Sequence, residues 1–221
     1  MKIKTIRKSI FIGIIIVILS CISILVFIRY NKLNTHNSML KTFSQITGNE
    51  IILGNEDAHY SVIVYFDYNC SFCKKFFNKT YPALNEKYIK TGKVKLILKL
   101  VCSNTDTNAL AAYQTAICVN KFGDYSKLHK LLMHKSEIIY TEHFSKLVDE
   151  IIYSNVDIAE CILDSNYNPV KENNYQLEEL KTNGTPTFVI NNNVIAGYKD
   201  FFTIEKILTN EYSLNKYNSD E

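Results

Sequence analysis

The sequence predicts an α/β fold in which a block of helices interrupts a sheet, with one apolar helix ahead of it. Three observations predict this class. A run of nineteen residues without a charge begins near the N-terminus, at Ile10. Strand-like segments lie on both sides of residues 104–182, which carry only helical patterns. The chain, at 221 residues, is long enough for a domain with its own core.

The uncharged run from Ile10 to Ile28 has about the length that a helix needs to cross a bilayer. Four basic residues and no acidic residue precede it, so the positive-inside tendency keeps the N-terminus in the cytoplasm. We expect residues 1–30 to be an uncleaved anchor in the inner membrane, with the rest of the chain in the periplasm, because no small-residue cleavage site follows the run. The alternative is a cleaved signal peptide, which would leave a soluble periplasmic protein.

The rest of the chain gives no sign of nucleic-acid binding. The net charge of +3 depends on the N-terminal segment, because five of the 25 basic residues lie within the first thirty positions. From residue 31 onward, 20 basic residues stand against 22 acidic ones, and no basic stripe is visible. Residues 31–47 are polar and have no periodic pattern, and we expect them to form a tether.

Residues 48–103 predict the first part of the α/β domain. An apolar piece at 51–53 and a turn lead to a β-branched run at 62–66, which suits a strand buried on both faces. Two cysteines follow, and phenylalanines then recur with helical spacing until Pro82, which we expect to break or kink the helix. The alternating segment "KVKLILKLV" predicts the next strand. The cysteines therefore lie at a strand-to-helix junction.

Residues 104–182 predict a helical insertion, and residues 183–213 predict the second part of the α/β domain. Each helical stretch of the insertion opens or closes on Asp, Thr, Asn or Gly. The segments "TPTFVI" and "NVIAGY" flank three asparagines, Asn191 to Asn193, as a tight hairpin. An amphipathic helix, "FFTIEKILTNEY", precedes a tail at 214–221. A parallel sheet interrupted by one insertion is the simplest arrangement of these elements.

The two cysteines of the strand-to-helix junction, Cys70 and Cys73, are three positions apart. Structural zinc needs four ligands, and we interpret His129 and His134, on an amphipathic helix, as structural instead. A static cross-link over so short a loop would remove little entropy from the unfolded chain. The first turn of a helix favours a negative charge on Cys70, and Cys73, one turn further, is suited to resolve a mixed disulfide. The pair therefore predicts thiol–disulfide exchange without a metal or another cofactor.

A second motif, "NGTPTFVI", places Pro186 at the start of a strand, where a residue that cannot donate to a sheet is tolerated. Together, "YFDYNCSFCKKF", "YPALNEKYIKTGKVKLI", "AAYQTAICVNKFGDYSKLH" and "GTPTFVINNNVIAGY", in this order, resemble the DsbA-like thiol:disulfide oxidoreductases over about residues 50–210. The resemblance implies a thioredoxin fold with an inserted helical domain. It implies that Cys70 is the nucleophile, that Cys73 is the resolving thiol, and that Thr185–Pro186 is a cis-proline loop that binds an extended substrate segment.

The same resemblance implies an exported dithiol oxidase that introduces disulfide bonds into other exported proteins while these are unfolded or reduced. The redox-active Cys70–Cys73 disulfide would take the place of a cofactor, and a membrane partner of the DsbB type would reoxidise it. A reductase or isomerase of the same fold is one alternative. A tethered, non-catalytic binding or assembly module is the alternative from another class.

Two departures from the family pattern concern the strength of oxidation. Ser71 and Phe72 stand between the cysteines, where the best-known members have Pro-His. Val64 stands where relatives often have a buried carboxylate. We therefore expect the Cys70–Cys73 pair to oxidise substrates less strongly than the cysteine pairs of the best-known members do. The exchange chemistry itself should be the same.

The remaining cysteines lie outside the motif. Cys118 and Cys161 fall in two predicted helices of the insertion. Some relatives have a similar pair as a structural disulfide, and the alternative is two buried free thiols that pack as small apolar side chains. Cys102 follows a predicted strand and is either buried and inert or a competitor of Cys161 for Cys118. Cys21 lies within the apolar run.

Overall fold

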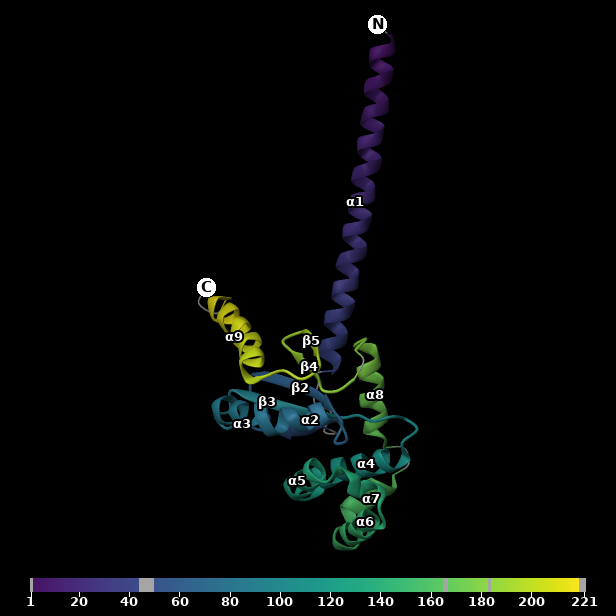
Figure 1. Ribbon diagram of the computed structural model, residues 1–221. Coiled ribbons are helices and arrows are strands. Elements are labelled where there is room, and N and C mark those ends of the chain that lie inside the picture. Colours follow the sequence, from purple (N-terminus) through teal and green to yellow (C-terminus); the bar gives the residue numbers. More distant parts are fainter. Residues whose placement is uncertain (1, 44–49, 165–166, 183, 219–221) are drawn as a thin grey trace. The chain divides into compact units, whose positions relative to one another are not determined.

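The computed structural model describes residues 2–43, 50–164, 167–182 and 184–218, and the chain divides into two compact units, residues 1–45 and 46–221 (Figure 1). The first unit is one helix, α1 (Lys2–Phe43). Its large apolar side chains between Ile14 and Ile28 are exposed, and by length and composition it could cross a membrane.

Of the tether expected over residues 31–47, residues 31–43 are helical and continue α1. This segment contains neither proline nor glycine, the two residues that most strongly oppose a helix, so nothing in it ends the helix. The remaining residues of that prediction, 44–47, lie outside the described residues.

The second unit contains a five-stranded sheet in the order β1-β3-β2-β4-β5. The strands are β1 (Ile51–Leu53), β2 (Tyr60–Phe66), β3 (Val94–Leu100), β4 (Thr187–Ile190) and β5 (Asn193–Ala196). The predicted parallel sheet is wrong, because β2 and β3 pair in parallel whereas β1–β3, β2–β4 and β4–β5 pair antiparallel. A helical crossover between β2 and β3 permits parallel pairing, while the short hairpin between β4 and β5 forces the opposite direction.

The predicted hairpin has a two-residue turn, which is shorter than expected. Asn191 and Asn192 have φ angles of 52° and 62°, and Asn193 already pairs with Ile190 as part of β5. Positive φ at both central residues is the requirement of the type I′ turn, whose twist matches that of the flanking strands. Asparagine tolerates this conformation better than most residues, which explains the run of asparagines.

β2 forms the centre of the sheet, with its residues 62–66 all buried. Val64 packs in the main hydrophobic core, so the position at which relatives often have a carboxylate is apolar here in structure as well as in sequence. The opposite face of the sheet carries the buried Lys99, whose Nζ donates to Gln176 Oε1 at 2.7 Å. Tyr65 Oη donates to the same oxygen at 3.0 Å, so this buried charge has polar partners.

The crossover from β2 to β3 is one continuous helical run of four pieces: α2 (Ser71–Lys75), η1 (Phe76–Thr80), α3 (Tyr81–Leu84) and η2 (Asn85–Ile89). The expected break or kink at Pro82 is replaced by a change of helix type, because η1 has the wider π-helical turn. Pro82 then falls in the first turn of α3, where its missing N–H is not needed.

The helical insertion begins after β3 and is confirmed over its described residues, which contain no strand. Its helices are α4 (Thr107–Phe122), α5 (Tyr125–His134), η3 (Ser136–Tyr140), α6 (Glu142–Ser154), α7 (Val156–Leu163) and α8 (Pro169–Glu179). Four of them begin at a side chain that accepts from a backbone N–H of the first turn: Asp106, Asp124, Asn155 and Asn168. Helices α4 to α7 lie together, whereas α8 lies beside the sheet (Figure 1).

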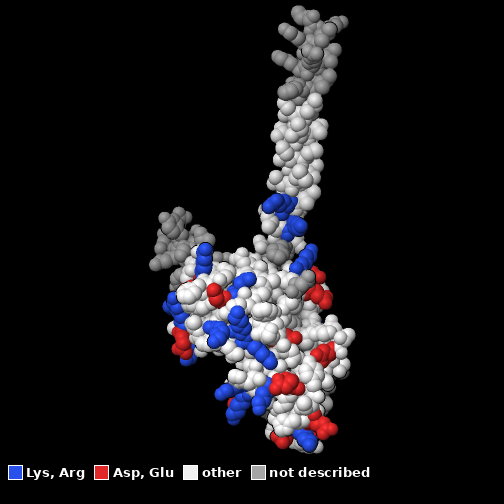
Figure 2. Space-filling view, in the orientation of Figure 1, with Lys and Arg blue, Asp and Glu red and all other residues white. Residues whose placement is uncertain are grey.

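The last helix, α9 (Phe201–Asn218), continues past residue 214, where a tail was expected. Lysines, arginines and acidic residues are interspersed on the visible face of the second unit (Figure 2). This face therefore carries no uniformly basic surface.

Candidate active site

Cys70 lies at the N-terminal cap of α2, directly after the loop that leaves the central strand. Its backbone N–H donates to the carbonyl of Asp67 at 3.1 Å, and its own carbonyl accepts from the N–H of Lys74 at 3.0 Å. These two bonds hold the cysteine at the junction between strand and helix. The side chain is half-buried, so its sulfur is accessible from outside.

The sulfur of Cys70 faces the segment that leads into β4. Cys70 Sγ donates to the carbonyl oxygen of Thr185 at 3.2 Å, and the peptide bond between Thr185 and Pro186 is cis. Because β4 pairs antiparallel with β2, with Thr187 opposite Tyr65, the start of β4 lies at the end of β2 from which the cysteine loop leaves. The structure thus brings Cys70, Thr185 and Pro186 together.

Cys73 lies one helical turn beyond Cys70 and is 0% exposed. Both thiols are free, so the structure represents the reduced pair. Burial raises the pKa of the Cys73 thiol, while the backbone N–H of Asp67 and the hydroxyl of Thr185 act in the opposite direction. Ser71 is exposed, and Phe72 is 57% exposed, so an apolar ring lies on the surface between an accessible thiol and a buried one.

Asp67 holds the cysteine loop, although no sequence pattern predicted this role. Its carboxylate accepts from Tyr113 Oη and, at 2.7 Å, from the backbone N–H of Asn69. Burial raises the pKa of the carboxyl group, and these two hydrogen bonds lower it. The sequence does show an aspartate at a turn, and such a side chain often accepts a hydrogen bond from the backbone N–H two residues later. Tyr113 comes from α4, so no local pattern could reveal it.

Tyr68, in the cysteine loop, forms a group of polar side chains with Tyr125 and His129 of α5. The Tyr68 hydroxyl is 2.7 Å from the Tyr125 hydroxyl and 2.8 Å from His129 Nδ1, and Tyr125 Oη is 2.9 Å from the same nitrogen. Burial lowers the pKa of His129 to about 4, so the ring is neutral at pH 7. His134, at the end of α5, is exposed. Among the described residues, no three His, Cys, Asp or Glu side chains are grouped as a metal would require.

Of the other cysteines in the second unit, two form a disulfide and one is a free thiol. Cys118 and Cys161 form a disulfide between α4 and α7, with an S–S distance of 2.03 Å. Cys102 remains a free, half-buried thiol, and so does not compete for Cys118. Burial raises its pKa to about 12, and the charges of Asp67 and Asp106 act in the same direction. A thiol of this kind is a poor nucleophile at neutral pH.

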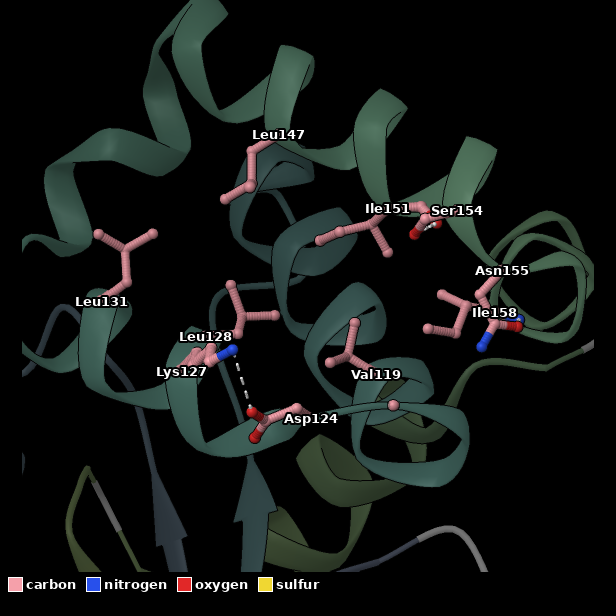
Figure 3. A pocket seen from close by; sticks show the side chains of 11 residues that line it. Val119, Asp124, Lys127, Leu128, Leu131, Leu147, Ile151, Ser154, Asn155 and Ile158 are labelled. Carbon is pink, nitrogen blue, oxygen red and sulfur yellow. Dashed lines mark hydrogen bonds and ion pairs between the residues drawn. The ribbon is translucent and has the colours of Figure 1, made fainter.

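Among the cavities of the second unit, one lies in the helical insertion and another lies beside the cysteine loop. One, of about 390 Å³, lies within the helical insertion and has mostly aliphatic walls, with the pair Asp124 and Lys127 at 3.7 Å on one side (Figure 3). The other, of about 490 Å³, is lined mostly by polar residues, among them Asp67 and Thr185. The second cavity is therefore lined by the two residues whose carbonyls accept hydrogen bonds from Cys70.

The chain has relatives among proteins of known name. It is 24% identical to disulfide bond formation protein D of Bacillus subtilis over 189 residues, which cover 82% of this chain and 85% of the relative. It is 23% identical over 159 residues to a Rickettsia typhi protein that is named as an unproven protein-disulfide oxidoreductase. That match covers 68% of this chain, and the chain spans only 58% of the rickettsial relative.

Among solved structures, the fold is similar to that of α-DsbA1 from Wolbachia pipientis. The TM-score is 0.61 at 21% sequence identity, and the match covers 78% of this chain and 96% of the other. The sequence model of the thioredoxin family matches residues 46–210, which is well over half of the chain. The predicted thioredoxin fold with a helical insertion is therefore confirmed. The chain belongs to the thioredoxin family, and its fold is similar to that of a DsbA protein.

Proposed function

We propose that the chain is an exported, membrane-anchored thiol:disulfide oxidoreductase, and that it acts as a dithiol oxidase on other exported proteins. The observation that carries the proposal is the position of Cys70 Sγ, 3.2 Å from the Thr185 carbonyl, with Cys73 buried one turn away. An accessible thiol beside a protected one suits exchange through a mixed disulfide. The name of the Bacillus subtilis relative, a disulfide bond formation protein, supports the oxidising direction.

Each turnover would begin with the oxidised pair. A substrate thiolate attacks Cys70 Sγ, the Cys70–Cys73 bond breaks, and Cys73 leaves as a thiolate that takes up a proton. Because burial raises the pKa of Cys73, the neutral thiol is favoured and does not attack back at once. A second substrate thiolate then attacks the substrate sulfur of the mixed disulfide and expels Cys70 as a thiolate. The substrate has lost two electrons and the pair has gained them.

The electrons would leave the pair through a membrane partner of the DsbB type, which restores the Cys70–Cys73 disulfide. No metal or organic cofactor is required for this cycle, because the two sulfurs carry the electrons. The substrate would lie as an extended segment against the backbone of Thr185, ahead of Pro186. Pairing of this kind recognises the backbone more than the side chains, which suits unfolded or reduced proteins as substrates.

The location is proposed from α1 and from the disulfide in the insertion. The N-terminus would lie in the cytoplasm and the α/β unit in the periplasm, held by α1 in the inner membrane. If α1 were removed as a signal peptide, the unit would be soluble in the periplasm. The Cys118–Cys161 disulfide supports export, because structural disulfides persist in oxidising compartments.

The direction of exchange is tested by the redox potential of the pair. The full chain in detergent is equilibrated with mixtures of reduced and oxidised glutathione, and the oxidised fraction of Cys70–Cys73 is measured by mass spectrometry after alkylation. A potential well above that of thioredoxin supports the oxidase. A potential near that of thioredoxin would favour the reductase or isomerase with the same residues.

The activity itself is tested by single substitutions. Cys70→Ser should abolish exchange. Cys73→Ala should accumulate mixed disulfides with proteins that contain a disulfide bond, because Cys70 attacks that bond, the other substrate sulfur leaves as a thiolate, and the thiol that would release Cys70 is missing. Cys21→Ser, in α1 and outside the α/β unit, is the matched control and should behave as wild type. A tethered binding module would instead keep its binding in Cys70→Ser and trap nothing in Cys73→Ala.

A further inference from the structure

The polar cavity of about 490 Å³ is adjacent to the cysteine loop. Its wall is formed by the residue that follows β2, the loop after β3, helix α8 and the segment that leads to the cis-proline. Side chains from all of these parts contribute, among them Asp67, Cys102, Asn174, Glu178, Thr182 and Thr185. A cavity of this size, at 300 Å³ or more, is in the usual range of ligand sites.

Two wall residues also hold the catalytic cysteine. The carbonyl of Thr185 accepts from Cys70 Sγ, and the carbonyl of Asp67 accepts from the Cys70 N–H. A polypeptide whose cysteine is joined to Cys70 must therefore lie at the edge of the cavity. An extended chain advances by about 3.3–3.6 Å per residue, so positions next to the substrate cysteine are within reach of the cavity.

The charged side chains that line the cavity are all acidic. Asp67 and Glu178 contribute carboxylates, and the lining residues include no Lys, Arg or His. Asp106 adds a further negative charge that acts on Asp67. Lys74 is the cation that acts on Asp67, and its ammonium group donates to Ser136 Oγ at 2.9 Å.

The neutral polar groups of the wall are largely engaged with one another. Asn174 Nδ2 donates to the carbonyl of Cys102 at 2.8 Å and to Asn104 Oδ1 at 2.6 Å. The Cys102 backbone N–H donates in turn to Asn174 Oδ1 at 3.2 Å. The carboxylate of Glu178 lies on the exposed side of α8, at the wall and accessible to an incoming charge. The wall therefore offers a cation an acceptor without breaking these bonds.

We propose that this cavity is a specificity subsite, which takes a lysine or arginine side chain of the substrate polypeptide one or two residues from the reacting cysteine. The inference deepens the proposed function and rests on it, because the substrate reaches the cavity through its bond to Cys70. The apolar stem of the side chain packs against Leu177, while the cationic end lies near Glu178. An exposed pair of this kind gives a modest preference, about two- to fivefold in rate.

The test uses the full-length protein in detergent, oxidised at Cys70–Cys73, and three synthetic peptides with one cysteine each. The peptides carry Lys, Ser or Glu on both sides of the cysteine and are otherwise identical. The initial rate of exchange is measured by acid quench and chromatography. Each rate is divided by the rate of the same peptide with 2,2′-dithiodipyridine, a neutral disulfide, because a neighbouring charge also changes the reactivity of the thiol itself.

The wild-type protein should prefer the Lys peptide over the Glu peptide by about two- to fivefold in normalised rate, and high salt should reduce this preference. Glu178→Gln should bring the ratio close to one. Glu179→Gln removes the same charge from the next residue of α8, which does not line the cavity, and should keep the wild-type ratio.

Two results would overturn the subsite alone: the Ser peptide reacts but the wild type shows no preference, or Glu178→Gln and Glu179→Gln change the ratio equally. If the Ser peptide does not react with Cys70 in any variant, the proposed exchange activity fails and the subsite fails with it. Exchange of the neutral peptide therefore separates the two failures.

Discussion

His129 makes the stability of this protein depend on pH in a way that can be worked out from its surroundings. Burial lowers its pKa from 6.5 to about 4 in the folded state, where Nδ1 lies within hydrogen-bonding distance of the Tyr68 and Tyr125 hydroxyls. In the unfolded chain the ring returns to its ordinary pKa. Between these two values the unfolded state binds more protons, so stability falls as the pH falls.

The size of the effect follows from the two pKa values. At pH 7 the ring is mostly neutral in both states, and its contribution to the pH dependence is close to zero. At pH 5 the unfolded state is protonated while the folded state is not, and the loss is about 2 kcal/mol relative to pH 7. This is a large part of the ~5–15 kcal/mol by which domains are usually stable.

The assay is urea unfolding of the full chain in detergent, followed by the near-UV circular dichroism of tyrosine, since the chain has no tryptophan. His129→Phe should cost about 1–2 kcal/mol at pH 7, because hydrogen bonds to the hydroxyls are lost. The gap to wild type should close by pH 5. His134→Gln, on the same helix but exposed, is the control and should follow the wild type. Equal pH slopes for wild type and His129→Phe would refute the reasoning.

Three further predictions concern the cysteines and their support. Replacing Cys118 and Cys161 together by alanine should lower the free energy of unfolding by about 2–4 kcal/mol, because the bond closes a loop of 43 residues; an unchanged urea midpoint would contradict this. Iodoacetamide should modify Cys70 well before Cys73, because Cys73 is 0% exposed. The two rates are measured by peptide mass spectrometry, and equal rates would contradict protection by burial. Asn174→Ala should cost about 1–3 kcal/mol and speed amide exchange at Cys102, in the loop after β3, because Asn174 binds the backbone of Cys102; an unchanged exchange rate at Cys102 would contradict this.

The sequence predicted those features that depend on short stretches of chain. The buried run at 62–66 indicated a central strand, and the alternation of 93–101 indicated the strand beside it. Two cysteines three apart at a helix start must lie one turn apart, so the geometry of Cys70 and Cys73 follows from local periodicity. Two local features were not expected from the sequence: a π-helical turn accommodates Pro82, and residues 31–43 continue α1 as a helix.

Strand direction was the main failure at the level of the sheet. Patterns of apolar residues show which segments are strands, but they do not show which neighbour a strand finds or in which direction it runs. The antiparallel pairing of β2 with β4 is what brings Thr185 to the cysteine loop. The resemblance to a family supplied this proximity as an expectation, and the residue patterns alone did not.

The sequence by itself thus determined the apolar N-terminal helix, the α/β class, the interruption by helices and the spacing of the cysteine pair, because each is encoded within a few turns or strands. Only the tertiary structure decided that Asp67 is held by Tyr113, that Cys118 bonds Cys161, and that a polar cavity borders Cys70. These features join residues that are distant along the chain. Their proximity depends on how whole elements pack, which no short stretch of sequence records.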